Sequence, residues 1–203
     1  MEIEPLEQDW YYTLRKSGEG LYKDKGSKFY GYAFPANEAG EALQHLEVLQ
    51  KKHHSARHFC YAYRCHPQQP EVRINDDGEP AHSAGTPIFG AIKAQQLWNV
   101  MIVVVRYFGG TKLGVPGLIK AYRTAAEDAI GNSTIHKAVI RKTMEITFPY
   151  ALTGEVMQLL EKQKVPISEN KMTQTAVLRI EPRLSAVKKL KAALSELPDV
   201  RLE

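Results

Sequence analysis

The sequence predicts an α/β (α+β) protein of two domains, for three reasons. Short apolar or aromatic runs alternate with amphipathic runs along the chain, which indicates a mixture of strands and helices. The 203 residues are 43% hydrophobic and 25% charged, as in ordinary globular proteins. This alternation of strand-like and helix-like runs is interrupted near residue 139 and then begins again. We therefore expect one domain over residues 1–138 and a second over residues 139–203.

The first third of the chain has the pattern of strands followed by a helix. Three aromatic-rich runs separated by turn residues predict strands at 11–16, 20–24 and 27–34. Farther on, Asn37 can cap a helix whose leucines recur on one face. Two more strands are expected at 58–65 and 71–75, joined by the segment PQQP.

The middle of the chain combines a long loop, a buried strand and two helices. After the loop NDDGEPAHSAGTP, Thr86 is placed to cap a helix that runs to about Trp98. The run VMIVVVRYF at 100–108 does not alternate between apolar and polar residues, which is typical of a strand buried on both faces. Pro116 is expected to open the next helix, and Gly131 to end it.

From Thr143 onward the runs follow the order strand, helix, strand, strand, helix, strand. The first strand is TMEITFPY, and the last helix is LSAVKKLKAALSEL. This βαββαβ order is that of ferredoxin-like domains. We therefore expect a C-terminal ferredoxin-like domain.

The loop GGTKLGVPG lies between the buried strand and the helix that follows it. It has the spacing of neither a Walker A motif nor G-x-G-x-x-G, so neither nucleotide fingerprint applies. Unpaired N–H groups at a helix start bind anions, and Arg106 and Lys112 add positive charge. A tight strand-to-helix connection that needs small residues explains the same glycines.

The stretch 99–142 has seven basic residues against Glu127 and Asp128. A local basic excess is typical of a surface that meets a polyanion, although it is also typical of an ordinary solvated face. The candidate residues for anion or nucleic-acid binding are Arg106, Tyr107, Gly109, Gly110, Lys112, Gly114, Lys120 and Arg123.

The long loop places three acidic residues close together. The residues of this motif loop are Asp76, Asp77, Gly78, Glu79, Pro80, Gly85 and Thr86. Their carboxylates can hold Mg²⁺ or act as acid and base, or they can contact a partner directly. They can instead bond free N–H groups at the start of the next helix, or pair with Arg106 and Lys112.

The histidines and cysteines have no metal-binding spacing. Neither CxxC nor HExxH occurs, and His53 and its neighbours fit buried or hydrogen-bonded histidines better than zinc ligands. We find no convincing nucleophile, so we expect no catalytic residue, no metal and no cofactor. Two cysteines, no long apolar run and an acidic N-terminus predict a cytoplasmic protein without a membrane partner.

Two long motifs resemble the paired signature of the IMPACT family (the YigZ/YIH type), and the chain is similar to its bacterial two-domain members. The motifs are NDDGEPAHSAGTPI and VVVRYFGGTKLGVPGLIKAY, and KDKGSKFYGYAFP and ARHFCYAYR resemble further segments of the family. The resemblance implies a first domain with the two-layer fold of ribosomal protein S5 domain 2. It also implies a second domain similar to the last domain of elongation factor G. Eukaryotic relatives regulate translation by competing for an activator of an initiation-factor kinase.

Three hypotheses about function follow. The first is a non-catalytic protein that associates with RNA or the ribosome and takes part in the regulation of translation. The second is a metal-assisted hydrolase or phosphotransferase that uses Asp76, Asp77 and Glu79. The third is a docking module for a protein partner in translation control.

Overall fold

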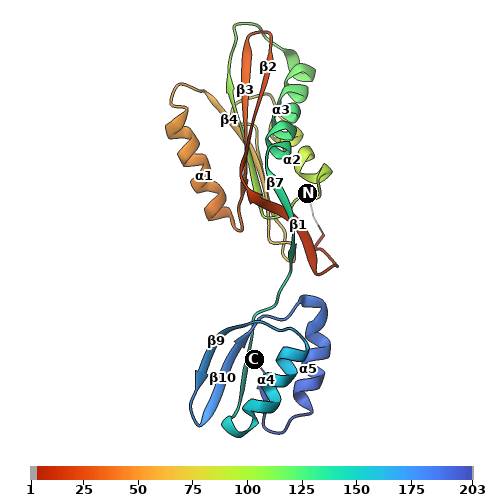
Figure 1. Cartoon of the computed structure of the whole chain (residues 1–203). Helices are drawn as coiled ribbons and strands as arrows, with labels where there is room; N and C mark the ends of the chain where they lie inside the picture. Colours follow the sequence, from red (N-terminus) through yellow and green to blue (C-terminus); the bar gives the residue numbers. More distant parts are fainter. Residues whose placement is uncertain (1–3, 203) are drawn as a thin grey trace. The chain divides into compact units, whose positions relative to one another are not determined.

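The computed structural model describes residues 4–202 of the chain. Its internal contacts divide the chain into two compact units (Figure 1). Among the described residues, the first unit holds 4–6 and Tyr11–Ala138, and the second holds Glu7–Trp10 and 139–202. The short segment Glu7–Trp10 belongs to the second unit, where the Ile140 N–H donates to the Asp9 carbonyl (2.7 Å).

The first unit is built on a five-stranded antiparallel sheet. In spatial order its strands are β2 (Gly18–Asp24), β3 (Ser27–Pro35), β6 (Val100–Tyr107), β4 (His58–Cys65) and β5 (Glu71–Asn75). The strand β6 is central, which explains why its sequence is apolar on both faces. Two further strands, β1 (Trp10–Lys16) and β7 (Thr134–Val139), pair in a separate ribbon.

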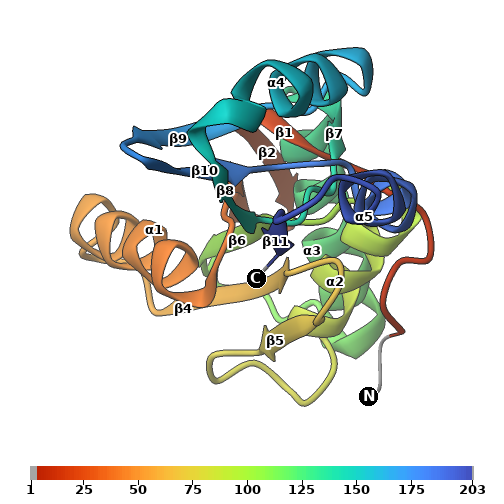
Figure 2. The same ribbon diagram turned by 90° about the horizontal axis from the view of Figure 1, so that it is seen from below.

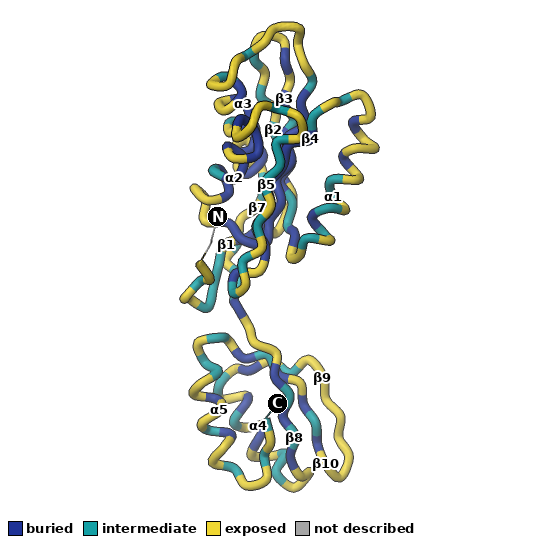
Figure 3. The backbone as a smooth tube through the Cα atoms, turned by 180° about the vertical axis from the view of Figure 1, so that it is seen from behind, coloured by how far each residue is buried: buried dark blue, intermediate teal, exposed yellow. Residues whose placement is uncertain are grey.

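Helices cover both faces of this sheet. On one face lie α2 (Gly85–Ala94) and α3 (Gly114–Gly131), and on the other lies α1 (Ala39–Lys52) (Figures 1 and 2). Successive residues of β6 pack on opposite faces of the sheet. Ile102 and Val104 pack with α2 and α3. Val103 and Val105 pack on the α1 side. The sheet with α2 and α3 gives the expected two layers, and α1 adds a third. Buried residues concentrate between these layers (Figure 3).

The helix starts differ from the sequence prediction. The residue before α1 is Glu38, and its side chain forms no cap; the side chain of Asn37 bonds Glu41 instead. The N-terminus of α2 is capped by Asp76, so the assignment of this role to Thr86 was wrong. The helix α2 ends at Ala94, four residues before Trp98, and α3 begins at Gly114, two residues before Pro116.

The second unit has the predicted ferredoxin-like order. Its elements are β8 (Met144–Pro149), α4 (Thr153–Lys162), β9 (Ile167–Met172), β10 (Thr175–Ile180), α5 (Val187–Ser195) and β11 (Arg201–Leu202). One-turn 3₁₀ helices, Tyr150–Leu152 and Leu184–Ala186, precede the two helices. The sheet order is β11-β8-β10-β9, and its core joins Ile146 and Leu178 to Leu160 and Leu190 of the helices.

Among the described residues, no helix is both long enough and apolar enough to cross a membrane.

Candidate nucleic-acid interface

The three acidic residues of the motif loop are bonded within the fold. The Asp76 carboxylate accepts hydrogen bonds from the N–H groups of Ala84 (3.0 Å) and Gly85 (2.8 Å) at the start of α2. The Asp77 carboxylate accepts from the Phe59 N–H (2.6 Å). Glu79 Oε1 accepts from Arg106 Nη1 (2.6 Å). This confirms the interpretation that the carboxylates bond a helix start and pair with Arg106.

Arg106 is therefore not the surface cation that the sequence suggested. Its side chain is 7% exposed, and the side chain of Glu79 is 4% exposed. The expectation was wrong because Arg106 follows Ile102 and Val104 on the α2 and α3 side of β6, where Glu79 neutralises its charge. The guanidinium carbon also lies 5.4 Å from the centre of the Phe29 ring.

Two of the other predicted cations, Lys120 and Arg123, lie on the face opposite Tyr107. Lys120 and Arg123 are exposed on α3, which covers one face of the sheet, whereas Tyr107 packs on the α1 face. Lys112 is exposed in the loop before α3. The predicted anion site is therefore corrected for Arg106, which is buried, and for Tyr107, which lies on the other face. Anion binding by Lys112, Lys120 and Arg123 stays a prediction.

The glycine loop is tied to the turn between β2 and β3. The Gly109 N–H donates to Ser27 Oγ (3.0 Å), and a Cβ at Gly109 would lie 1.9 Å from the carbonyl carbon of Gly26. Gly110 has a φ of +86° and Gly114 a φ of +71°, which other residues rarely adopt. Close approach and left-handed backbone therefore explain these glycines, and the contact joins the loop that carries Lys112 to the β2–β3 turn.

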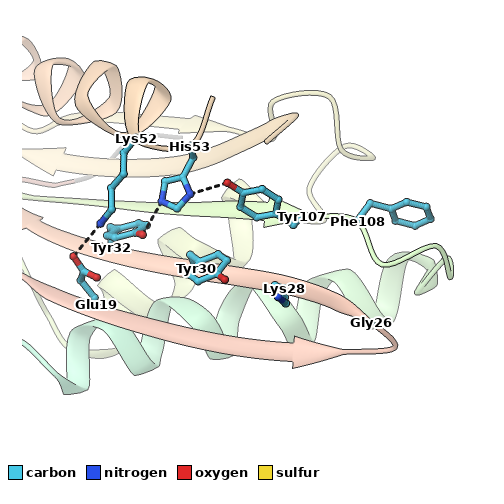
Figure 4. A pocket seen from close by; sticks show the side chains of 9 residues that line it. All are labelled: Glu19, Gly26, Lys28, Tyr30, Tyr32, Lys52, His53, Tyr107 and Phe108. Atoms are coloured by element: carbon cyan, nitrogen blue, oxygen red, sulfur yellow. Dashed lines mark hydrogen bonds and ion pairs between the residues drawn. The ribbon is translucent and has the colours of Figure 1, made fainter. Parts of the chain in front are cut away.

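On the α1 side of the sheet lies a cavity of about 670 Å³ (Figure 4). It is lined by Glu19, Gly26, Lys28, Tyr30, Tyr32, Lys52, His53, Tyr107 and Phe108. We call it the tyrosine pocket. Its volume falls in the range of roughly 300–1,000 Å³ that is usual for small-ligand sites.

Strand register arranges the residues of the tyrosine pocket in order along β3. Lys28 is paired with Lys23 on β2 and with Tyr107 on β6. Two residues along β3 comes Tyr30, and two residues beyond it Tyr32, which is paired with Glu19. The pocket thus has Lys28 at the end near the turn, tyrosine rings in the middle, and the ion pair of Glu19 and Lys52 at the other end.

His53, just after α1, holds the floor of the pocket in place. Its Nε2 hydrogen-bonds the Tyr32 hydroxyl (2.7 Å), and its Nδ1 hydrogen-bonds the Tyr107 hydroxyl (2.9 Å). Burial lowers the pKa of His53, and the nearby charge of Lys52 lowers it further. A neutral imidazole has one N–H, so it donates to one of these hydroxyls and accepts from the other. The expectation of a buried, hydrogen-bonded histidine is confirmed here.

Only part of the tyrosine pocket was predicted from the sequence. Tyr107 was a candidate, but Lys28, Tyr30 and Lys52 were not. The turn KDKGSK, rich in lysine and followed by alternating tyrosines, was the available signal. Lys52 gave no such signal, because its position depends on how α1 lies across the sheet.

Among residues 4–202, no group of three His, Cys, Asp or Glu side chains is arranged to hold a metal ion.

Comparison with known proteins agrees with the motifs. The family model of the Impact N-terminal domain matches residues 25–130, a range that includes the motif loop, the glycine loop and most of the tyrosine pocket. The chain belongs to the IMPACT family. This confirms the family that its two long motifs resemble.

Relatives of this IMPACT-family chain come from several bacteria. An "IMPACT family member in pol 5'region" from Thermus thermophilus is 37% identical over 180 residues, covering 87% of this chain and 96% of that protein. "IMPACT family member YvyE" from Bacillus subtilis is 29% identical and covers 78% of this chain and 73% of its own length. A solved structure described as a hypothetical protein has a TM-score of 0.73 at 23% identity and covers 96% of this chain and 97% of its own, which shows the shared two-domain fold.

Proposed function

We propose that this IMPACT-family protein binds single-stranded RNA in the tyrosine pocket, as a non-catalytic protein in the control of translation. The observation that carries the proposal is an accessible cavity that combines lysines with tyrosine rings. Proteins that bind single strands join a positively charged groove to aromatic side chains on which bases stack.

Lysines are concentrated at the end of the pocket near the β2–β3 turn. Lys23 and Lys28 face each other on neighbouring strands, and Lys25 lies in the turn between them. Lys112 is in the loop that Gly109 ties to this turn. All four lysines are exposed, so each can meet a phosphate without breaking a buried contact. We expect them to hold the RNA backbone without reading its sequence.

Aromatic rings next to these lysines are available to bases. Tyr30 and Tyr107 are half-buried, and their rings meet edge to face at 5.7 Å. Phe108 at the rim is 57% exposed, and the Arg106 guanidinium carbon lies 5.5 Å from the centre of its ring, which leaves the exposed part of the ring for a base. Stacking on an aromatic side chain contributes about 1–3 kcal/mol per base, so two rings would add substantially to the phosphate contacts.

The role in translation control follows from the family resemblance, since eukaryotic relatives regulate translation. An RNA-binding pocket suits such a role because the ribosome and its messenger offer unpaired strands. The hydrogen bonds of Asp76, Asp77 and Glu79 within the fold argue against a metal-assisted hydrolase that uses these carboxylates.

The proposal is tested by fluorescence anisotropy with a labelled twelve-nucleotide uridine RNA at several salt concentrations. Binding should weaken steeply with salt, and Lys28→Gln and Lys112→Gln should each lower the slope of log K against log[salt] by about 0.7, the contribution of one phosphate contact in a single strand. Lys16→Gln removes an exposed lysine of β1 and should leave the slope unchanged. Absence of binding at low salt, or equal behaviour of the three variants, would contradict the proposal.

A further inference from the structure

We infer that Glu19 and Lys52, at the carboxylate end of the tyrosine pocket, recognise guanine in the bound RNA. The inference rests on the proposed function and adds base selection to it. The Glu19 carboxylate would repel a phosphate, but it can accept hydrogen bonds from a group that donates them. The edge of a base, which offers N–H donors, is such a contact.

The two charged groups are held close together at the pocket surface. Lys52 Nζ lies 3.5 Å from Glu19 Oε1, and the side chains are 52% and 68% exposed, respectively. The ammonium also sits 4.8 Å from the centre of the Tyr32 ring, whose hydroxyl is bonded to His53. The pair thus has a defined position and remains open to a ligand (Figure 4).

A base stacked on Tyr30 would reach this pair. Glu19 is directly opposite Tyr32, which makes it a diagonal neighbour of Tyr30 across the strands. Diagonal neighbours are separated by roughly 7–8 Å, within the span of a base and a glutamate side chain. Lys28 lies two residues from Tyr30 in the other direction, at roughly 7 Å along the strand. One nucleotide can therefore place its base edge at Glu19 and its phosphate at Lys28.

Guanine complements the pair better than the other bases do. Its Watson–Crick edge presents one acceptor, O6, followed by two donors, N1–H and N2–H. The ammonium of Lys52 can donate to O6 while the Glu19 carboxylate accepts both N–H groups side by side. Adenine, cytosine and uracil each offer the carboxylate a donor from only one position. Bidentate contacts to a base edge discriminate more strongly than single hydrogen bonds.

The test compares three eight-nucleotide RNAs that are uridine throughout except for one central guanosine, inosine or uridine. Inosine lacks only the 2-amino group of guanosine. Anisotropy titrations of the wild-type protein should give at least about fivefold tighter binding for the guanosine RNA than for the uridine RNA, at the low end of a bidentate contact. Inosine should give an intermediate affinity.

Glu19→Gln should abolish the difference between guanosine and inosine while binding is retained. Glu47→Gln removes an exposed carboxylate on α1 and should preserve that difference. Matching circular dichroism spectra and thermal midpoints establish that both variants are folded.

Equal affinity of the wild-type protein for the three RNAs would overturn the inference and leave the proposed function intact. So would a Glu19→Gln variant that binds all three more tightly by the same factor, because Glu19 would then act only by repulsion. Failure of every RNA to bind at low salt would overturn the proposed function itself.

Discussion

Arg106 Nη1 donates a hydrogen bond to Glu79 Oε1 across 2.6 Å, with both side chains almost wholly buried. The Tyr122 hydroxyl donates to the same oxygen (2.8 Å). These contacts join the motif loop to the central strand β6 and to the middle of α3. The motif loop and the segment from β6 to α3 thus meet in a buried cluster of Glu79, Arg106 and Tyr122, which we call the Glu79 cluster. The proposed ligand site lies on the other face of the sheet.

The Glu79 cluster should contribute to the stability of the fold and not to the binding of RNA. Removing one partner of a buried ion pair leaves the other charge uncompensated, so Arg106→Ala should lower the free energy of unfolding by about 3–5 kcal/mol in urea denaturation. Lys112→Ala, at an exposed lysine, should change it by less than about 0.5 kcal/mol. If the Arg106→Ala protein is as stable as wild type but fails to bind RNA, Arg106 contacts the RNA and is not a buried structural residue.

Asp76 and Thr86 give contrasting predictions about the start of α2. Asp76→Ala removes the acceptor of two backbone N–H groups and should cost about 2 kcal/mol of unfolding free energy. Thr86→Ala removes a hydroxyl with a 3.3 Å contact to exposed His82 and should cost less than about 0.5 kcal/mol. Thermal unfolding of both variants measures which loses more stability. A larger loss in Thr86→Ala than in Asp76→Ala would show that Thr86 caps α2.

Local patterns were sufficient to predict much of the fold. The unbroken apolar run of β6 predicts a strand buried on both faces, and β6 is the central strand. The βαββαβ order after Thr143 predicts the ferredoxin-like unit, because this order and short connections leave few ways to pair the strands. Turn residues likewise predict the β2–β3 hairpin.

The functional surface could be predicted only in part, because its contacts are distant in sequence. The partner of Arg106 is 27 residues away, and nothing local shows that Glu79 turns inward. The cap of α2 comes from a residue nine positions before Gly85. The tyrosine pocket forms only when β3 pairs with β6 and His53 bonds both, over separations of 21 and 54 residues.

The buried cysteines should make the free energy of unfolding fall at alkaline pH. Burial raises the pKa of the Cys65 thiol to about 12 and raises that of Cys60 still further. Above pH 9.0, the ordinary thiol pKa, the unfolded chain loses protons that the native protein keeps. The free energy of unfolding should therefore decrease with pH there, by up to about 1.4 kcal/mol per pH unit for each thiol.

Urea denaturation between pH 9 and pH 10 measures this slope. Cys65→Ala should reduce the slope, because one of the two titrating thiols is removed. Native protein at pH 9 should also react with iodoacetamide far more slowly than protein in urea. Rapid modification of Cys60 in the native protein would contradict the buried, protonated thiol.

Gly109 and Gly131 provide a matched pair of glycine substitutions. Gly109→Ala forces a methyl group against the backbone of Gly26 and should cost about 1–3 kcal/mol of unfolding free energy. It should also weaken RNA binding, because the loop that carries Lys112 would separate from the β2–β3 turn. Gly131→Ala, at the end of α3 with no atom within 4 Å of the added methyl, should leave stability unchanged or raise it by up to about 1 kcal/mol. Equal stability and RNA affinity of the two variants would contradict the close contact.

Ultraviolet cross-linking to uridine RNA, followed by mass spectrometry of the digested protein, measures whether single-stranded RNA lies on the α1 side of the sheet. We expect cross-links at Tyr30 or Tyr107, and their loss when excess unlabelled RNA competes. Cross-links confined to α3 or to the second unit would contradict this placement of the RNA.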